Sequence, residues 1–369
     1  MPHGSRAARL LAALGALALA LACGSGAAGP AATSRPATAA PSAAAAPTSA
    51  PSAPAASGAT ATSPPSVKLR VPYVAISVSQ LPAWVAQDAG TFAKNGLDVS
   101  LQYIPTGSTL IQTMVAGEAD FGIAGSEAPI GASLGGSRIV ILAPTVDRLL
   151  FEVYAGPAVA DAAAMRGRRI GITRVGSSTD FAARQWIQSL GLRPGDDMAI
   201  VQLGGQQEIL AGLQSGAADA GVLSPPTDVE ARRVGMHEIA DLSKLEVPFY
   251  QSSVLATGRV IDEQPDVVRR FVRAIVEANA IIHQDKAAAK QALARYSQSD
   301  DEEVLESSYE TALPAIPKVP LPTRAAVESA IELLSLTNPA ARGVDPDRFY
   351  DPRFVQELQD SGFIDSLYR

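Results

Sequence analysis

Hydroxyl and amide side chains follow the first two expected strands, where the chain turns into helices. The loop 76–82 carries Ser77, Ser79 and Gln80, and the next such loop carries Gly107 and Ser108. Hydroxyls and free backbone N–H groups at a helix start can hold polar or anionic groups, although each of these residues can equally cap a helix. The residue types therefore favour non-covalent binding of a small polar molecule.

Further candidates lie in four later segments. Glu127 can accept a hydrogen bond from an amine or a ring N–H, or it can be a solvated surface carboxylate. Tyr250 can stack on a ring or pack near a hinge. One Glu and one Arg among neutral hydroxyls favour a neutral or mixed-charge ligand over a bare oxyanion. These further candidates are Ser126, Glu127, Arg174, Gly176, Ser177, Ser178, Thr179, Ser224 and Tyr250.

Cysteine and histidine, the residues most often needed for a metal site or a thiol nucleophile, are scarce in this chain. It has one cysteine, and its three histidines, His3, His237 and His283, are too far apart in sequence to suggest a metal-binding motif. Neither a P-loop nor a G-x-S-x-G nucleophile motif occurs. The net charge of −7 argues against a nucleic-acid partner. We expect no catalytic residue, no metal and no cofactor.

The N-terminus is typical of a bacterial targeting segment. Arg6 and Arg9 precede an uncharged run, 10–22, that is too short to span a bilayer and suits a secretory signal peptide. Cys23, the only cysteine, follows this run within a sequence that resembles a lipobox, except that Ala20 stands where Leu is usual. An ordinary signal peptide with an incidental Cys is the alternative. We expect residues 1–22 to be a signal peptide and Cys23 to be lipidated, which anchors the protein to the membrane outside the cytoplasm.

A disordered linker is expected over residues 23–66, because from residue 24 on it holds no Val, Leu, Ile or aromatic residue and cannot form a core. Expected strands and helices alternate beyond it. Residues 82–93 are typical of a helix, and 97–103 alternate apolar and polar residues as a strand does. This alternation predicts an α/β fold with mostly parallel sheets flanked by helices. A length of about 300 residues predicts two lobes.

An internal repeat supports two similar lobes. The segment 114–123 parallels the segment 213–222, with Gly117, Asp120 and Gly122 each matched 99 residues later. Each copy is expected to be a helix that ends at a glycine and then enters a strand. Chance recurrence of a common helix-to-strand turn is the alternative interpretation.

Three stretches carry family-specific patterns: 84–99, 117–122, and 165–172, the last followed by Gly176, Ser177 and Ser178. In order and spacing they resemble the type II periplasmic binding proteins that bind aliphatic sulfonates, taurine, nitrate and thiamine precursors. The resemblance covers residues 67–360 and implies two lobes joined by two hinge crossovers. Lobe 1 is expected to comprise 67–155 and 255–369, and lobe 2 to comprise 156–254.

The resemblance also implies a function. It indicates a monomeric solute-binding protein that captures a sulfonate, nitrate, a pyrimidine or related heterocycle, or an aromatic acid in the cleft between its lobes. Its partners would be the permease and ATPase of an ABC importer. Two alternatives stay open: an enzyme related to those that make a thiamine precursor, and a ligand-sensing receptor domain.

Overall fold

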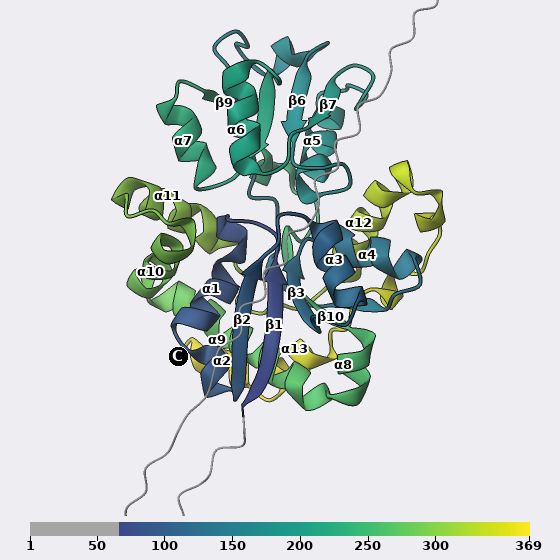
Figure 1. Ribbon diagram of the computed structural model, residues 1–369, viewed down its shortest axis with the longest axis vertical. Helices are drawn as coiled ribbons and strands as arrows, with labels where there is room; N and C mark the ends of the chain where they lie inside the picture. The colour runs from purple at the N-terminus through teal and green to yellow at the C-terminus, as the bar shows by residue number, and fades with distance from the viewer. Residues whose placement is uncertain (1–65) are drawn as a thin grey trace, which may run out of the picture. The chain divides into compact units, whose positions relative to one another are not determined.

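The computed structural model describes residues 66–369. The expected signal peptide, Cys23 and the linker up to residue 65 lie outside the described residues, so these expectations stay predictions. The described residues form two β-sheets, each covered by helices (Figure 1). The α/β fold expected from the alternating pattern is therefore confirmed.

The first sheet has five strands in the order β2-β1-β3-β10-β4. β1 runs parallel to both β2 and β3, whereas β10 is antiparallel to both β3 and β4, so the sheet is mixed. The parallel pairs come from strand–helix–strand units, which bring each strand back in the same direction. The strands are β1 (Val67–Tyr73), β2 (Leu97–Tyr103), β3 (Phe121–Ala124), β4 (Ile139–Val146) and β10 (Ser252–Thr257).

Helices cover this sheet, and the longest of them, α9, buries one apolar face against it. Phe271 of α9 stacks on Phe121 of β3 with ring centroids 4.3 Å apart. None of the helices in the described part of the chain is both long and apolar enough to span a membrane. The helices of the first lobe are α1 (Leu81–Asp88), α2 (Thr91–Lys94), α3 (Gly107–Val115), α4 (Glu127–Leu134), α8 (Gly258–Glu263), α9 (Pro265–Gln284), α10 (Lys286–Ser297), α11 (Glu302–Ala312), α12 (Arg324–Thr337), α13 (Arg353–Asp360) and α14 (Phe363–Leu367).

The second sheet repeats the arrangement of the first, with the order β7-β6-β8-β5-β9. β6 is parallel to β7 and β8, and β5 is antiparallel to β8 and β9. Its strands are β5 (Glu152–Ala155), β6 (Arg169–Ile172), β7 (Ala199–Gln202), β8 (Ala220–Leu223) and β9 (His237–Asp241), and its helices are α5 (Ser178–Ser189), α6 (Gln206–Ser215) and α7 (Thr227–Arg233).

Two crossovers join the sheets, at positions that differ from the boundaries expected at residues 155 and 255. β5 pairs with β8 and β9 and so belongs to the second sheet, although it was expected in lobe 1. The chain leaves the first sheet after Val146 and returns to it at Ser252. Sequence pattern identifies a strand but not its pairing partner, and the boundary was misplaced for that reason.

The helix expected over 82–93 is interrupted. α1 ends at Asp88, and Gly90 adopts a left-handed backbone with φ +73° before α2 begins at Thr91. Glycine adopts this conformation without the steric cost that other residues incur. The break turns the chain so that β2 can lie beside β1.

The internal repeat has a physical basis in both lobes. Gly117 and Gly216 both have left-handed backbones, with φ of +76° and +74°. Gly122 and Gly221 lie where the preceding helix crosses the strand, and a Cβ at Gly221 would lie 2.4 Å from Ile209. Glycine at these places therefore lets α3 and α6 pack directly onto β3 and β8.

We predict that Gly221→Ala lowers the free energy of unfolding by roughly 1–3 kcal/mol, because the added methyl group overpacks the contact with Ile209. Gly131→Ala is the matched control: it lies within α4, where a Cβ meets nothing within 4 Å, and alanine favours the helix. Urea unfolding checks both variants. Equal stability of the two variants would contradict the packing explanation.

Candidate functional site

A cavity of about 800 Å³ lies between the lobes, where the parallel strands of both sheets end. Ligands of open α/β sheets bind at this edge because the loops and helix starts that follow the strands converge there. Most of the expected site residues line it: Ser77, Ser79, Gln80, Gly107, Ser108, Glu127, Arg174, Gly176, Ser177, Ser178, Thr179 and Ser224.

Hydrogen bonds cross the cavity from one lobe to the other. Ser77 Oγ and Ser224 Oγ lie 3.1 Å apart, and the backbone N–H of Val78 donates to the carbonyl oxygen of Pro225 at 3.2 Å. Arg174 donates to Ser108 Oγ at 2.7 Å. The two lobes are therefore held together around the cavity.

An exposed ion pair adds a contact between the lobes. Arg233 at the end of α7 reaches Asp301 at 2.7 Å and Glu303 at 2.9 Å, both at the start of α11. The two carboxylates hold the pKa of the Arg233 guanidinium above its ordinary value. Because this pair is exposed, salt screens it.

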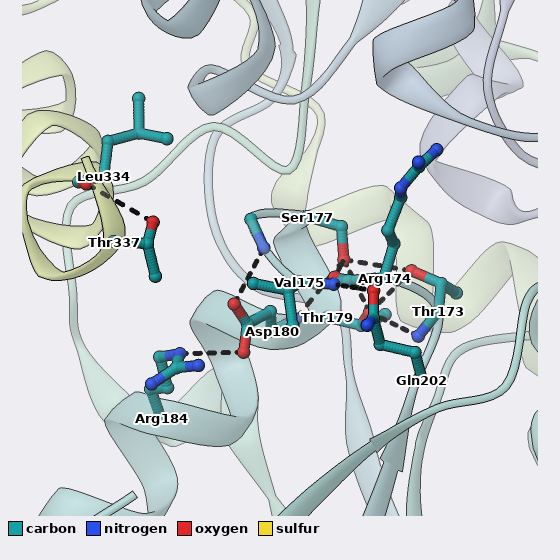
Figure 2. Close-up of polar contacts among 11 residues, drawn as sticks. Thr173, Arg174, Val175, Ser177, Thr179, Asp180, Arg184, Gln202, Leu334 and Thr337 are labelled. Atoms are coloured by element: carbon teal, nitrogen blue, oxygen red, sulfur yellow. Dashed lines mark hydrogen bonds and ion pairs between the residues drawn. The ribbon is translucent and has the colours of Figure 1, made fainter. Parts of the chain in front are cut away.

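The turn between β6 and α5 is fixed by its own hydroxyl groups. Thr173 Oγ1 lies 2.7 Å from Thr179 Oγ1 and 3.0 Å from Ser177 Oγ, and the N–H of Gly176 donates to Asp180 at 2.8 Å. Figure 2 shows these contacts and shows the Arg174 side chain extending away from the hydroxyl cluster. Arg174 is thereby directed to the opposite lobe, which it contacts at Ser108.

Glu127 is the first residue of α4, and its side chain is only 7% exposed, which excludes the surface carboxylate considered above. Ser178 Oγ, from the other lobe, donates to Glu127 Oε1 at 3.1 Å. Burial, and to a smaller extent the neighbouring Asp180 carboxylate, raise the pKa of Glu127 to about 7, against the opposing effect of its hydrogen bonds. A Cβ at Gly125 would lie 2.3 Å from Glu127 Oε2, so glycine at this position makes room for the carboxylate.

Two of the expected residues do not line the cavity. Ser126 is fully buried beneath it, and its backbone N–H donates to the carbonyl oxygen of Tyr250. Tyr250 packs near the second crossover, where its hydroxyl lies 2.9 Å from Thr323 Oγ1. Of the two roles considered for Tyr250, packing beside the hinge is the one that the geometry supports.

Several polar residues of the cavity wall were not predicted from the sequence. The loop between β7 and α6 follows a strand in the same way as the loops that were chosen, and this signal could have identified it. Gln251 and Glu230 come from the crossover and from α7, where no local pattern marks them. The missed polar residues include Tyr103, Gln112, Gln206, Gln207, Glu208, Thr227, Glu230 and Gln251.

Charged side chains of the cavity wall are mostly acidic. Glu127, Glu208 and Glu230 line it together with Arg174. Glu208 accepts from the N–H of Gly205 at 2.9 Å, and Glu230 accepts from Gln207 at 2.8 Å. Within residues 66–369, no group of three or more His, Cys, Asp or Glu side chains has a metal-binding arrangement.

Comparison with solved structures gives the same fold. The alkanesulfonate-binding protein of Xanthomonas axonopodis pv. citri matches with a TM-score of 0.64 at 16% identity, over 77% of this chain and 96% of that one. The nitrate-binding protein of Synechocystis PCC 6803 matches with a TM-score of 0.65 at 14% identity, over 82% and 91%. These likenesses identify the two-lobed periplasmic-binding-protein architecture.

Sequence comparison identifies the family. A Brachyspira hyodysenteriae protein named as an ABC transporter periplasmic binding protein is 24% identical over 235 residues, which is 58% of this chain and 65% of that protein. The chain therefore aligns with slightly less than two thirds of this relative. The model of the NMT1-like family matches residues 62–297, well over half of the chain. On this match, the chain belongs to the NMT1-like family.

Proposed function

We propose that this protein is the solute-binding subunit of an ABC importer and captures a small organic molecule in the cavity between its lobes. The observation that carries the proposal is the cavity itself, which both lobes build from strand ends and close with direct hydrogen bonds. A ligand held in this way bridges the lobes, so its binding favours their closure. The similarity to the Brachyspira protein, which is named as an ABC transporter periplasmic binding protein, supports the same function.

The size of the cavity favours an organic ligand. Pockets for small molecules commonly enclose about 300–1,000 Å³, and this one encloses about 800 Å³. Its wall includes apolar side chains such as Ile111, Phe151 and Leu334 beside the hydroxyls. A sulfonate, a pyrimidine or related heterocycle, or an aromatic acid uses this space better than nitrate does.

The partners and location follow from the same proposal. A permease and an ATPase would receive the ligand, and the protein would act as a monomer outside the cytoplasm. Lipidation of Cys23 would hold it at the membrane, with the segment up to residue 66 as a spacer. The names of the relatives support binding over catalysis, and the proposal therefore assigns no catalytic residue.

The ligand proposal is tested by thermal unfolding with a panel of alkanesulfonates, taurine, nitrate, pyrimidine precursors, flavins and aromatic carboxylates. A ligand at about 100 times its Kd stabilises the native state by roughly 2.7 kcal/mol, a shift of several degrees at most. We expect saturable stabilisation by one chemical class. No shift with any compound, combined with no small molecule released from the denatured protein in mass spectrometry, would contradict a binding function.

The location proposal is tested by Cys23→Ser. We expect the variant to move from the membrane fraction to the soluble extracytoplasmic fraction, because the acylated thiol is lost. Fractionation and intact-mass measurement check this, with Ser25→Ala as a neighbouring control that should stay at the membrane. A wild-type protein without acyl mass would contradict the anchor.

A further inference from the structure

Two buried oxygen atoms at the cavity wall have no hydrogen-bond partner among residues 66–369. They are Glu127 Oε2 and Gln80 Oε1, and both residues line the cavity. A buried polar atom without a partner is costly, so such atoms are normally satisfied by protein, water or ligand. Both atoms are acceptors when Glu127 is ionised, and their natural complement is therefore a hydrogen-bond donor.

The charges of the wall favour the same kind of ligand. Glu208 and Glu230 belong to the second lobe, are more exposed than Glu127, and each accept a hydrogen bond, from Gly205 and Gln207. Arg174 is exposed and donates to Ser108. Glu127 is thus the buried charged group that faces the ligand space, and a carboxylate repels a sulfonate or a nitrate and attracts a cation.

Glu127 also takes part in closure. Its Oε1 accepts from Ser178 of the opposite lobe, while its Oε2 is the atom without a partner. Gly125 leaves the space that the carboxylate and the Ser178 hydroxyl share, because a Cβ there would lie 2.4 Å from Ser178 Oγ. One carboxylate therefore connects the cavity with the contact between the lobes.

We infer that Glu127 determines specificity: its Oε2 accepts a hydrogen bond from a protonated nitrogen of the ligand. Its Oε1 couples ligand binding to lobe closure through the hydrogen bond from Ser178. The inference rests on the proposed function, because it concerns the ligand of the same cavity. Among the ligand classes left open above it favours a heterocycle with an N–H donor, it adds organic cations to them, and it argues against simple oxyanions.

The ionisation of Glu127 gives this arrangement a pH dependence. Its pKa is raised to about 7, so it is largely protonated below neutrality and ionised above it. The charged group that faces Glu127 is Asp180 of α5, which is paired with Arg184 at 2.8 Å, whereas Arg174, on the turn before α5, is directed to Ser108. A cation binds the ionised form, and its affinity should therefore rise between about pH 6 and pH 8.

The test uses three probes of one shape and different charge: benzylamine, benzyl alcohol and benzenesulfonate. Titration calorimetry measures their binding to the full chain carrying Cys23→Ser. We expect benzylamine to bind roughly tenfold or more tightly than benzyl alcohol at about pH 8, as a charge-assisted hydrogen bond predicts. Benzenesulfonate should bind most weakly.

Matched variants distinguish the contribution of the Glu127 carboxylate to ligand binding from general effects of a substitution. Glu127→Gln should remove both the preference for the amine and its pH dependence, whereas Glu118→Gln, an exposed position paired with Arg70, should change neither. Ser178→Ala should weaken amine binding, and Ser189→Ala on the same helix should not. Circular dichroism checks folding. Because Gln removes a carboxyl whose pKa burial raises, Glu127→Gln should not lower the unfolding temperature at about pH 8.

Three outcomes would overturn the inference: tighter binding of the sulfonate, an amine preference that survives in Glu127→Gln, and no measurable binding of the amine. The proposed function would stand in each case if the panel of compounds still yields a saturable ligand. If no compound of that panel stabilises the protein either, the proposed function itself is contradicted.

Discussion

The hydrogen bond from Ser178 to Glu127 joins two lobes that each have their own sheet, and the arrangement of the site depends on it. It places a buried carboxylate between the start of α4 in one lobe and the start of α5 in the other. Burial of a carboxylate is unfavourable unless hydrogen bonds or a counter-charge offset it. In the proposed binding mode, a ligand that supplies the missing partner would stabilise the closed arrangement of both lobes.

The fold produces this geometry because both lobes have the same sheet topology. In each five-stranded sheet four strands run in the same direction, and the remaining strand, antiparallel to its neighbours, is contributed by the chain after a crossover. The two crossovers after Val146 and before Ser252 leave the lobes connected by only two segments. Such connections allow hinge motion while each lobe stays rigid. The hydroxyl contacts of Thr173 with Ser177 and Thr179 fix the turn that carries Arg174 and Ser178.

Much of this could be predicted from the sequence, for physical reasons that are visible in particular residues. The period-two pattern of 97–103 and the glycine-ended repeat identified strands and helix ends correctly, because local sterics determine both. The loops chosen after the strands supplied twelve of the predicted site residues that line the cavity. The assignment of β5 to a lobe and the orientation of Tyr250 depend on pairing between distant segments, and no local pattern encodes that. From the sequence, Glu127 could be either a ligand-facing carboxylate or a solvated surface carboxylate. Only the packing of both lobes around it shows that it is buried.

Hydrogen–deuterium exchange, measured with and without the compound that stabilises the protein most, tests the proposed closure of both lobes around a ligand. We expect slower exchange at backbone amides of 77–80 and 125–128 in one lobe and of 174–179, 224 and 227 in the other, since the ligand closes both lobes around itself. Slower exchange in only one lobe, or only at the surface hollow beside Arg324 and Glu328 of α12, would contradict it.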